Sequence, residues 1–430
     1  MKKMVALLLS VMLMATTLMA CGTSAANNSS AGGGQKTEAT GKKELVMWGA
    51  WSGDQVGQLQ KQLKTYNDSQ NEVTVKYVVQ DSLEEKLLTA IAGGELPDVV
   101  LWDRYNTGSY ASKGALEPID DRVKKDNVDL KQFYDPAVDE MTYDGKLYGI
   151  PLLVDTRILF YNKTMLKEAN VDPASIKTWN DLESAAVKLT KRDGGKLTQA
   201  GFSLKDQGLF NIWLKQAGGK LVNDTNPPTT AFNSPEGLEV LNFWDKLLNK
   251  DKVYEIGFED GFGGNGFKAG KVAITYDGPW SLTDYKNAGI DFGVMEAPVG
   301  PKGDKGAYTG GFGLVIPKGA KNADASWNFI KWWTTNAENG VNFAKISGWI
   351  PANKKASNDS YFTQSEQYAP FVQALNYATI RPKNTGYSDV EGLALIPQLQ
   401  KFVAKEISAQ DALKQAQTQG DKIFADSAKK

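Results

Sequence analysis

Short apolar strands alternate with amphipathic helices from residue 44 onward, and this alternation constrains the fold more than any other feature. Residues 44–48 and 97–102 are short apolar runs, and residues 73–79 are rich in β-branched side chains. Residues 56–67 carry apolar side chains at helical spacing, and residues 83–92 form a second helical segment. The order strand–helix–strand–helix–strand predicts an α/β fold with a mostly parallel sheet.

The same alternation resumes in the rest of the chain. Strands are expected at 158–161, 272–276 and 313–316, and helices at 180–190, 235–248, 325–334 and 398–424. Hydrophobic residues make up 41% of the chain and charged residues 23%, which is normal for a soluble globular protein. The length is enough for two domains of ordinary size.

The composition excludes several kinds of chemistry. The chain has no histidine, which excludes Ser-His-Asp and Cys-His catalysis and any zinc site that needs imidazole. The net charge of −1 offers no electrostatic footprint for nucleic acid. No segment matches the calcium-binding EF-hand loop, so neither a metal nor a cofactor is expected. Carboxylates remain, and a glycosidase needs only two of them.

The N-terminus has the pattern of an export signal. Two lysines precede an apolar run over residues 5–20, which is too short for a comfortable membrane span. The only cysteine, Cys21, ends the sequence Leu-Met-Ala-Cys, which resembles a bacterial lipobox. We therefore expect residues 1–20 to be a signal peptide and residues 21–43 a flexible tether lipidated at Cys21. The alternative is an ordinary signal peptide that happens to contain a cysteine.

Several segments stand in a fixed order along the chain: Pro97-Asp98-Val99-Val100, Gly114 to Ile119, Lys146 to Pro151, Ile158 to Lys163, Lys268 to Ile274, Gly278-Pro279-Trp280, Gly310 to Gly313, and Gly348 to Ala352. This order resembles the substrate-binding lipoproteins of carbohydrate ABC importers, the maltose-binding-protein-like group of family 1 extracellular solute-binding proteins. Each segment alone is a weak signal, but the ordered set spans nearly the whole chain after the tether.

The resemblance implies an α/β fold of the type II periplasmic-binding-protein kind, with two lobes, an interlobe cleft and three interlobe crossings. The crossings are expected near 153–157, 311–316 and 359–366. Lobe one would comprise residues 44–153 and 316–362, and lobe two residues 154–315 and 363–430. Hinged closure of the lobes and a ligand beyond the strand ends would follow.

A sugar presents C–H faces to aromatic rings and hydroxyls to carboxylates, amides and arginine. Candidate contacts should therefore lie at strand ends rather than in strand middles. In the first half of the chain they are Trp48, Trp51, Asp103, Arg104 and Asp155. The resemblance implies an acidic ligand contact at Asp155. The alternatives are core tryptophans, a solvated turn with a local ion pair, and a hinge pair between Asp155 and Arg157.

Two further candidates lie later in the chain. Asp206 precedes an apolar helix and could equally be its cap. The Gly-Pro turn before Trp280 predicts a ring directed away from the strand, and the resemblance implies a stacking platform there; the alternative is packing against the next helix. The remaining candidates are the loop residues Gly310, Gly311, Trp349 and Tyr387, with hinge glycines as the alternative for the first two.

The sequence therefore predicts an extracytoplasmic, lipid-anchored, monomeric binding protein, not an enzyme. It would bind a sugar or oligosaccharide between its lobes and deliver it to the permease of an ABC transporter, with no nucleic-acid partner. The alternative is a surface-anchored glycosidase or polysaccharide lyase that uses a carboxylate pair, for which Asp155 and Asp103 are the conceivable members. A structural adhesin would require β-rich repeats, and the sequence has none.

Overall fold

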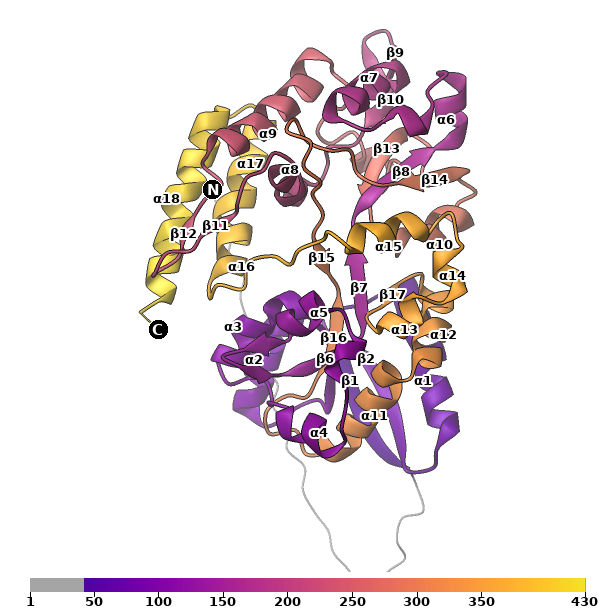
Figure 1. Ribbon diagram of the computed structural model, residues 1–430, viewed down its shortest axis with the longest axis vertical. Coiled ribbons are helices and arrows are strands. Elements are labelled where there is room, and N and C mark those ends of the chain that lie inside the picture. The colour runs from indigo at the N-terminus through magenta and orange to yellow at the C-terminus, as the bar shows by residue number, and fades with distance from the viewer. Residues whose placement is uncertain (1–41, 430) are drawn as a thin grey trace, which may run out of the picture. The chain divides into compact units, whose positions relative to one another are not determined.

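The computed structural model describes residues 42–429, which are built on two five-stranded sheets (Figure 1). The first sheet contains, in spatial order, β2 (Val73–Val79), β1 (Lys43–Gly49), β3 (Val99–Asp103), β16 (Phe312–Val315) and β6 (Gly149–Pro151). The second contains β14 (Phe292–Met295), β8 (Ile158–Asn162), β13 (Val272–Asp277), β10 (Lys196–Phe202) and β9 (Lys191–Asp193). The predicted α/β class is confirmed.

The first sheet forms as the alternation of strands and helices predicts. Strand β1 pairs in parallel with both β2 and β3, and the helices α1 (Asp54–Ser69) and α2 (Leu83–Gly93) make the connections. Helix α1 buries Leu59, Leu63 and Tyr66, which recur at helical spacing. Because β3 lies inside the sheet, its first four residues are all buried, which explains its unbroken apolar sequence.

The second sheet combines parallel and antiparallel pairing. Strand β8 is antiparallel to β13 and β14, whereas β10 is parallel to β13. Helix α7 (Trp179–Leu189) packs on β10 and begins with a capping box. The Asp181 carboxylate accepts the Thr178 backbone N–H at 2.8 Å, and the Thr178 hydroxyl oxygen accepts the Asp181 N–H at 3.3 Å. This cap fixes where the helix starts.

A small three-stranded sheet joins the two large ones. It consists of β15 (Thr309–Gly310), β7 (Leu153–Thr156) and β17 (Ile350–Pro351). The chain leaves the first sheet after β6, runs through β7 and enters the second sheet at β8. It returns from β14 through β15 to β16.

The ends of two expected crossings can be compared with the structure. Strand β16 pairs with β3 and β6, so residues 312–315 lie in the first sheet. Helix α14 (Ser360–Thr363) occupies the expected third crossing, and α15 (Ala369–Leu375) follows it and contacts both β7 and β8. The lobe boundaries stay a prediction.

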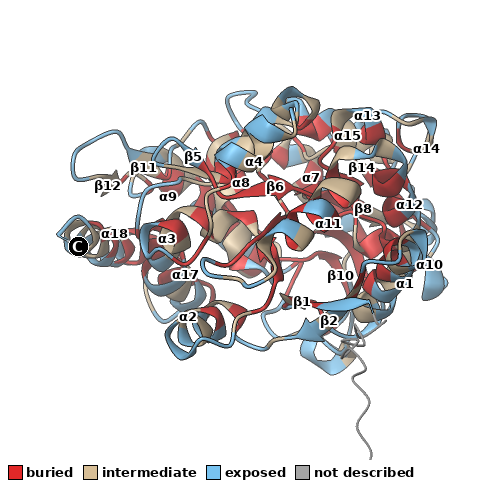
Figure 2. Ribbon diagram, turned by 90° about the horizontal axis from the view of Figure 1, so that it is seen from below, coloured by how far each residue is buried: buried red, intermediate tan, exposed pale blue. Residues whose placement is uncertain are grey.

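Helices and short strands complete the described chain. They are β4 (Thr142–Tyr143), β5 (Lys146–Leu147), β11 (Val222–Asn223), β12 (Thr229–Thr230), α3 (Thr107–Ser112), α4 (Asp120–Lys125), α5 (Asp135–Glu140), α6 (Lys163–Glu168), α8 (Phe210–Gln216), α9 (Pro235–Asp245), α10 (Ser281–Asn287), α11 (Ala323–Thr335), α12 (Ala337–Ser347), α13 (Lys354–Ser357), α16 (Tyr387–Asp389), α17 (Ile396–Val403) and α18 (Ala409–Ser427). Short 3₁₀ or π segments include η1 (Arg104–Asn106), η4 (Gln207–Leu209) and η7 (Val390–Leu395). Buried residues follow the strands and the inner helix faces (Figure 2).

The expected signal peptide, Cys21 and most of the expected tether lie outside the described residues. Strand β1 starts at Lys43, one residue before the expected start of order. Within residues 42–429, no helix has the length and apolar character needed to cross a membrane.

Candidate functional site

A cavity of about 480 Å³ lies between the two large sheets. Residues at the end of β3 and on β7 and β15 line it. Its size falls within the roughly 300–1,000 Å³ that is typical of small-molecule sites. Eight of the eleven candidate residues line it: Trp51, Asp103, Asp155, Asp206, Trp280, Gly310, Gly311 and Trp349. The structure thus brings to one cavity residues that are far apart in the sequence.

Three tryptophans form a stack in the cavity wall. The Trp349 ring centroid lies 4.9 Å from that of Trp280 and 5.3 Å from that of Trp51. Phe312 packs edge-on against Trp51, with 5.1 Å between centroids. Trp51 and Trp349 are only 4% and 5% exposed, whereas Trp280 is half-buried. Trp280 therefore offers the most ring surface to an occupant of the cavity, and the other two support it.

The position of the Trp280 ring depends on Gly278. The sequence predicts a turn that directs the ring away from the strand, and Gly278 is the first residue after the end of β13. The ring folds back over Gly278, where an added Cβ would lie 2.1 Å from a ring carbon. The Arg157 guanidinium lies 5.2 Å from the Trp280 ring centroid, in a cation–π arrangement. Glycine at 278 and these neighbours fix the ring in the wall.

Asp155 is the least exposed carboxylate of the cavity wall, at 6%. It lies on β7, opposite Gly310 of β15. Its Oδ1 atom is buried and has no hydrogen-bond partner among the described residues. Burial raises the pKa of Asp155, and the nearby Arg157 opposes this. A buried carboxylate oxygen without a donor costs free energy, so it marks a place where a hydroxyl or amine of a ligand would be stabilised.

The two glycines of the wall have different roles. Gly311 has a φ of 122°, and an added Cβ would lie 2.4 Å from the Leu153 carbonyl oxygen. Glycine is therefore required at 311, where β7 closely approaches the backbone between β15 and β16. Gly310 has more room, and its carbonyl oxygen accepts a hydrogen bond from Arg104.

Asp103 and Asp206 line the cavity and also cap short helical turns. The Asp103 carboxylate accepts the Tyr105 backbone N–H at 3.2 Å. The Asp206 carboxylate accepts the Gly208 backbone N–H at 2.9 Å. The cap considered for Asp206 from sequence is therefore present, and the same carboxylate still borders the cavity.

Three candidate residues do not reach this cavity. Trp48 is half-buried in β1 and packs against the hydrophobic core. Arg104 is 0% exposed because its guanidinium pairs with Glu140 and binds backbone carbonyls. Tyr387 is 1% exposed; its ring meets Tyr105 edge-on at 6.3 Å and borders a neighbouring cavity instead. For these three, a position beside a strand end or a glycine did not predict the direction of the side chain.

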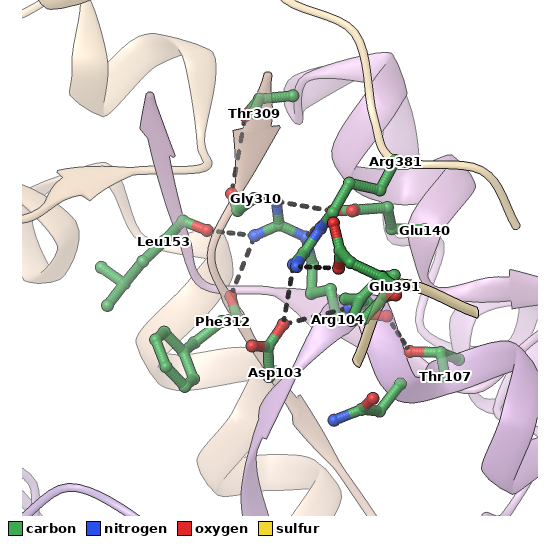
Figure 3. A network of polar contacts seen from close by, with 12 residues as sticks. Asp103, Arg104, Thr107, Glu140, Leu153, Thr309, Gly310, Phe312, Arg381 and Glu391 are labelled. Carbon is green, nitrogen blue, oxygen red and sulfur yellow. Dashed lines mark hydrogen bonds and ion pairs between the residues drawn. The ribbon is translucent and has the colours of Figure 1, made fainter. Parts of the chain in front are cut away.

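The sequence interpretation missed several polar residues of the wall. Arg381 is held between Asp103 and Glu391, with N–O distances of 4.0 and 3.4 Å (Figure 3). Arg157 was considered only as a hinge partner, although it stands two residues after Asp155. The other missed residues with polar side chains include Gln55, Asn211, Tyr308 and Thr309.

The charged residues of the wall are four carboxylates and two guanidinium groups, namely Asp103, Asp155, Asp206, Glu391, Arg157 and Arg381. The lining is therefore net negative, which disfavours an anionic occupant. Among residues 42–429, no group of three or more histidine, cysteine, aspartate or glutamate side chains is placed to hold a metal ion.

Comparison with known proteins places the chain in one family. Residues 61–370 match the family model described as bacterial extracellular solute-binding protein. The maltotriose-binding protein of Pyrococcus abyssi is 27% identical over 358 residues, which cover 82% of this chain and 76% of that protein. The maltodextrin-binding protein MdxE of Bacillus subtilis is 29% identical over 341 residues, covering 74% of this chain and 76% of that protein.

Solved structures give the same result. The GacH receptor of Streptomyces glaucescens, solved unliganded and with acarbose, superposes with a TM-score of 0.80 at 26% identity and covers 90% of this chain and 99% of that chain. A solute-binding protein of Thermotoga lettingae bound to α-D-tagatose gives a TM-score of 0.79 at 26% identity, with coverage of 89% and 100%. The resemblance to the maltose-binding-protein-like group of carbohydrate ABC transporters is confirmed. The chain belongs to the bacterial extracellular solute-binding proteins.

Proposed function

We propose that this protein binds a neutral sugar or short oligosaccharide in the 480 Å³ cavity and delivers it, unchanged, to the permease of an ABC transporter. It acts as a monomer outside the cytoplasmic membrane, tethered by lipid on Cys21. Trp280 and Asp155 are its central ligand contacts, and the other predicted residues that line the cavity are Trp51, Trp349, Asp103, Asp206, Gly310 and Gly311.

The observation that carries the proposal is the combination of Trp280 and Asp155 in one wall. Trp280 offers a half-buried ring, and C–H faces of a sugar stack on such rings. Asp155 offers a buried oxygen without a donor, and a sugar hydroxyl supplies that donor. An apolar ligand would leave this oxygen without a partner, which costs free energy.

The charge of the wall supports a neutral ligand. Four carboxylates against two guanidinium groups would repel a uronic acid or a sugar phosphate. A wall with both carboxylates and guanidinium groups suits hydroxyls, which both donate and accept hydrogen bonds. The relatives support the same class, since their names refer to maltotriose, maltodextrin and galactooligosaccharide.

The lipid anchor rests on the sequence Leu18-Met19-Ala20-Cys21 at the end of the apolar run. A related maltooligosaccharide-binding protein of Streptococcus pneumoniae is named a lipoprotein, which supports an anchor here. A protein tethered to the membrane by lipid would stay close to its permease, and this raises their effective concentration.

A thermal-shift screen tests the ligand class. The purified protein is heated with a panel of neutral mono- and oligosaccharides, and with galacturonate and glucose 6-phosphate as anionic controls. A ligand present at 100 times its Kd adds about 2.7 kcal/mol to the free energy of unfolding. At least one neutral saccharide should raise the unfolding temperature. Stabilisation by the anionic sugars alone would overturn the proposal.

The same saccharide tests the site and the absence of turnover. Asp155→Ala should abolish most of the stabilisation by that saccharide, whereas Asp193→Ala, an exposed change on β9, should not. After prolonged incubation with the protein, the saccharide should keep its mass and its reducing-end content. Consumption that depends on Asp155 or Asp103 would instead favour a glycosidase.

A further inference from the structure

Two further cavities lie beyond the one described above. A second cavity of about 180 Å³ shares Arg381 with the first, and a third of about 840 Å³ shares Ser109, Tyr143, Asn384 and Ser388 with the second. The three cavities therefore follow one another. Arg381 stands between the first and the second.

Arg381 is held in this position from several sides. Its guanidinium carbon lies 3.6 Å from the centroid of the Tyr105 ring, in a cation–π contact. Its nitrogens lie 4.0 Å from an Asp103 oxygen and 3.4 Å from a Glu391 oxygen. Asp103 is the last residue of β3 and Tyr105 lies in η1, whereas Glu391 belongs to η7. The side chain therefore connects the end of β3 with η7 at the border between the first and the second cavity.

The second cavity is built for a polar occupant. Glu140 and Tyr387 line it, and these residues are only 4% and 1% exposed. Glu140 Oε1 and the Tyr387 hydroxyl are both buried without a hydrogen-bond partner among the described residues. Together they offer an acceptor and a donor of the kind that bind sugar hydroxyls or ordered water.

We propose that Arg381 sets the length of saccharide that this protein accepts. The inference rests on the proposed function. Arg381 confines a bound chain to the first cavity, and a chain with further sugar units would have to displace its guanidinium from Tyr105, Asp103 and Glu391. Replacing Arg381 with a small residue joins the first cavity to the second and gives the next sugar unit a polar site.

The test is titration calorimetry with two sets of probes, maltose to maltopentaose and mannobiose to mannotetraose. In the wild type, the affinity should be highest at one length and fall for longer chains. In Arg381→Ala, the affinity for a chain one or two units longer should rise at least about tenfold relative to the affinity for the preferred length. The readout is this ratio within each variant, so a uniform change in affinity does not affect it.

Lys383→Ala is the matched control. Lys383 pairs with Asp139 and lines the second cavity, but it does not line the first. This variant should keep the wild-type length profile. If Arg381→Ala fails to fold, the double variant Arg381→Ala/Glu391→Gln replaces it, because this variant also removes the Glu391 carboxylate that has lost its partner. The length profile of the double variant is then compared with that of Glu391→Gln alone.

The outcomes separate this inference from the proposed function. If neither probe set, nor any neutral saccharide of the thermal-shift panel, binds the wild type, the proposed function itself is wrong. If the wild type binds saccharides but Arg381→Ala or the double variant keeps its reference profile, only the role of Arg381 is wrong. A wild type that binds long and short chains equally well would also overturn it.

Discussion

Arg104 and Glu140 form an ion pair shielded from solvent, with 3.0 Å between Nη2 and Oε2 and side-chain exposures of 0% and 2%. The same guanidinium donates to the carbonyl oxygens of Leu153, Gly310 and Phe312. These carbonyls belong to β7, β15 and β16, along which the chain passes between the two large sheets. One buried side chain therefore ties together the strands that border the cavity.

Loss of Arg104 should be strongly destabilising. Arg104→Ala leaves Glu140 buried without its partner, and breaking a buried pair in this way costs about 3–5 kcal/mol. The free energy of unfolding should be measured with denaturant at about pH 8, above the raised pKa of Glu140 in the wild type. Lys64→Ala, which removes an exposed pair with Asp68 on α1, is the control and should change stability little. Equal effects of the two changes would show that Arg104 has no special structural role.

Glu140 should make stability depend on pH. Burial raises its pKa to about 7; Arg104 and Arg381 lower it, and Asp103 and Asp155 raise it. Because the folded protein holds this proton more tightly than the unfolded chain, the stabilisation is complete below about pH 4.5 and is lost as the pH rises through about 7.

Glu140→Gln imitates the protonated side chain at every pH and so isolates this effect. Between about pH 5 and pH 8, the wild type should lose stability relative to Glu140→Gln. Denaturant unfolding of both proteins at the two pH values measures the difference. A difference that does not change with pH would mean that Glu140 does not titrate in this range.

The fold could be predicted because it depends on local patterns. The alternation of β1, α1, β2, α2 and β3 follows from periodicities of two and 3.6 residues, which the sequence shows directly. Asp103, the last residue of β3, and Asp155, on β7 of the small joining sheet, both reach the cavity because it lies where the chain passes between the two large sheets.

The rest of the site depends on contacts that no local pattern shows. Arg381 meets Asp103 from 278 residues away in the chain, and it lies in a stretch without strand or helix. Arg104 looked like a ligand contact because it follows a strand, but Glu140, 36 residues later, draws it into the interior. Trp51 was expected to expose its ring, yet Phe312 and Trp349 cover it.

Cys21 should be the point of lipid attachment. Cys21→Ala removes the only thiol, so the protein should stay unprocessed or, if another peptidase cuts nearby, be released from membranes. Fractionation of cells and intact mass of the membrane-bound protein measure both effects. Cys21→Ser is a closer isostere and should behave in the same way. Processed Cys21→Ala that still sediments with membranes would contradict the anchor.

Ligand should draw the lobes together. Arg381 already contacts Asp103, and Lys383 contacts Asp139, across the expected lobes. A ligand that touches both lobes binds the closed state more tightly than the open state, and this difference in affinity favours closure. Small-angle scattering with saturating saccharide should give a smaller radius of gyration than without it. An unchanged scattering curve despite tight binding would mean that the ligand does not change the arrangement of the lobes.

The most direct test of the account is the affinity of the best neutral saccharide for Trp280→Ala, measured by titration calorimetry. Loss of the half-buried ring that lines the cavity should weaken binding by about 1–3 kcal/mol while the stoichiometry stays near one to one. Trp332→Ala is the matched control, since Trp332 is also half-buried but packs on Tyr66, away from the cavity. A clear loss of affinity is expected for Trp280→Ala and none for Trp332→Ala. Wild-type affinity in a folded Trp280→Ala protein would contradict a sugar site in this cavity.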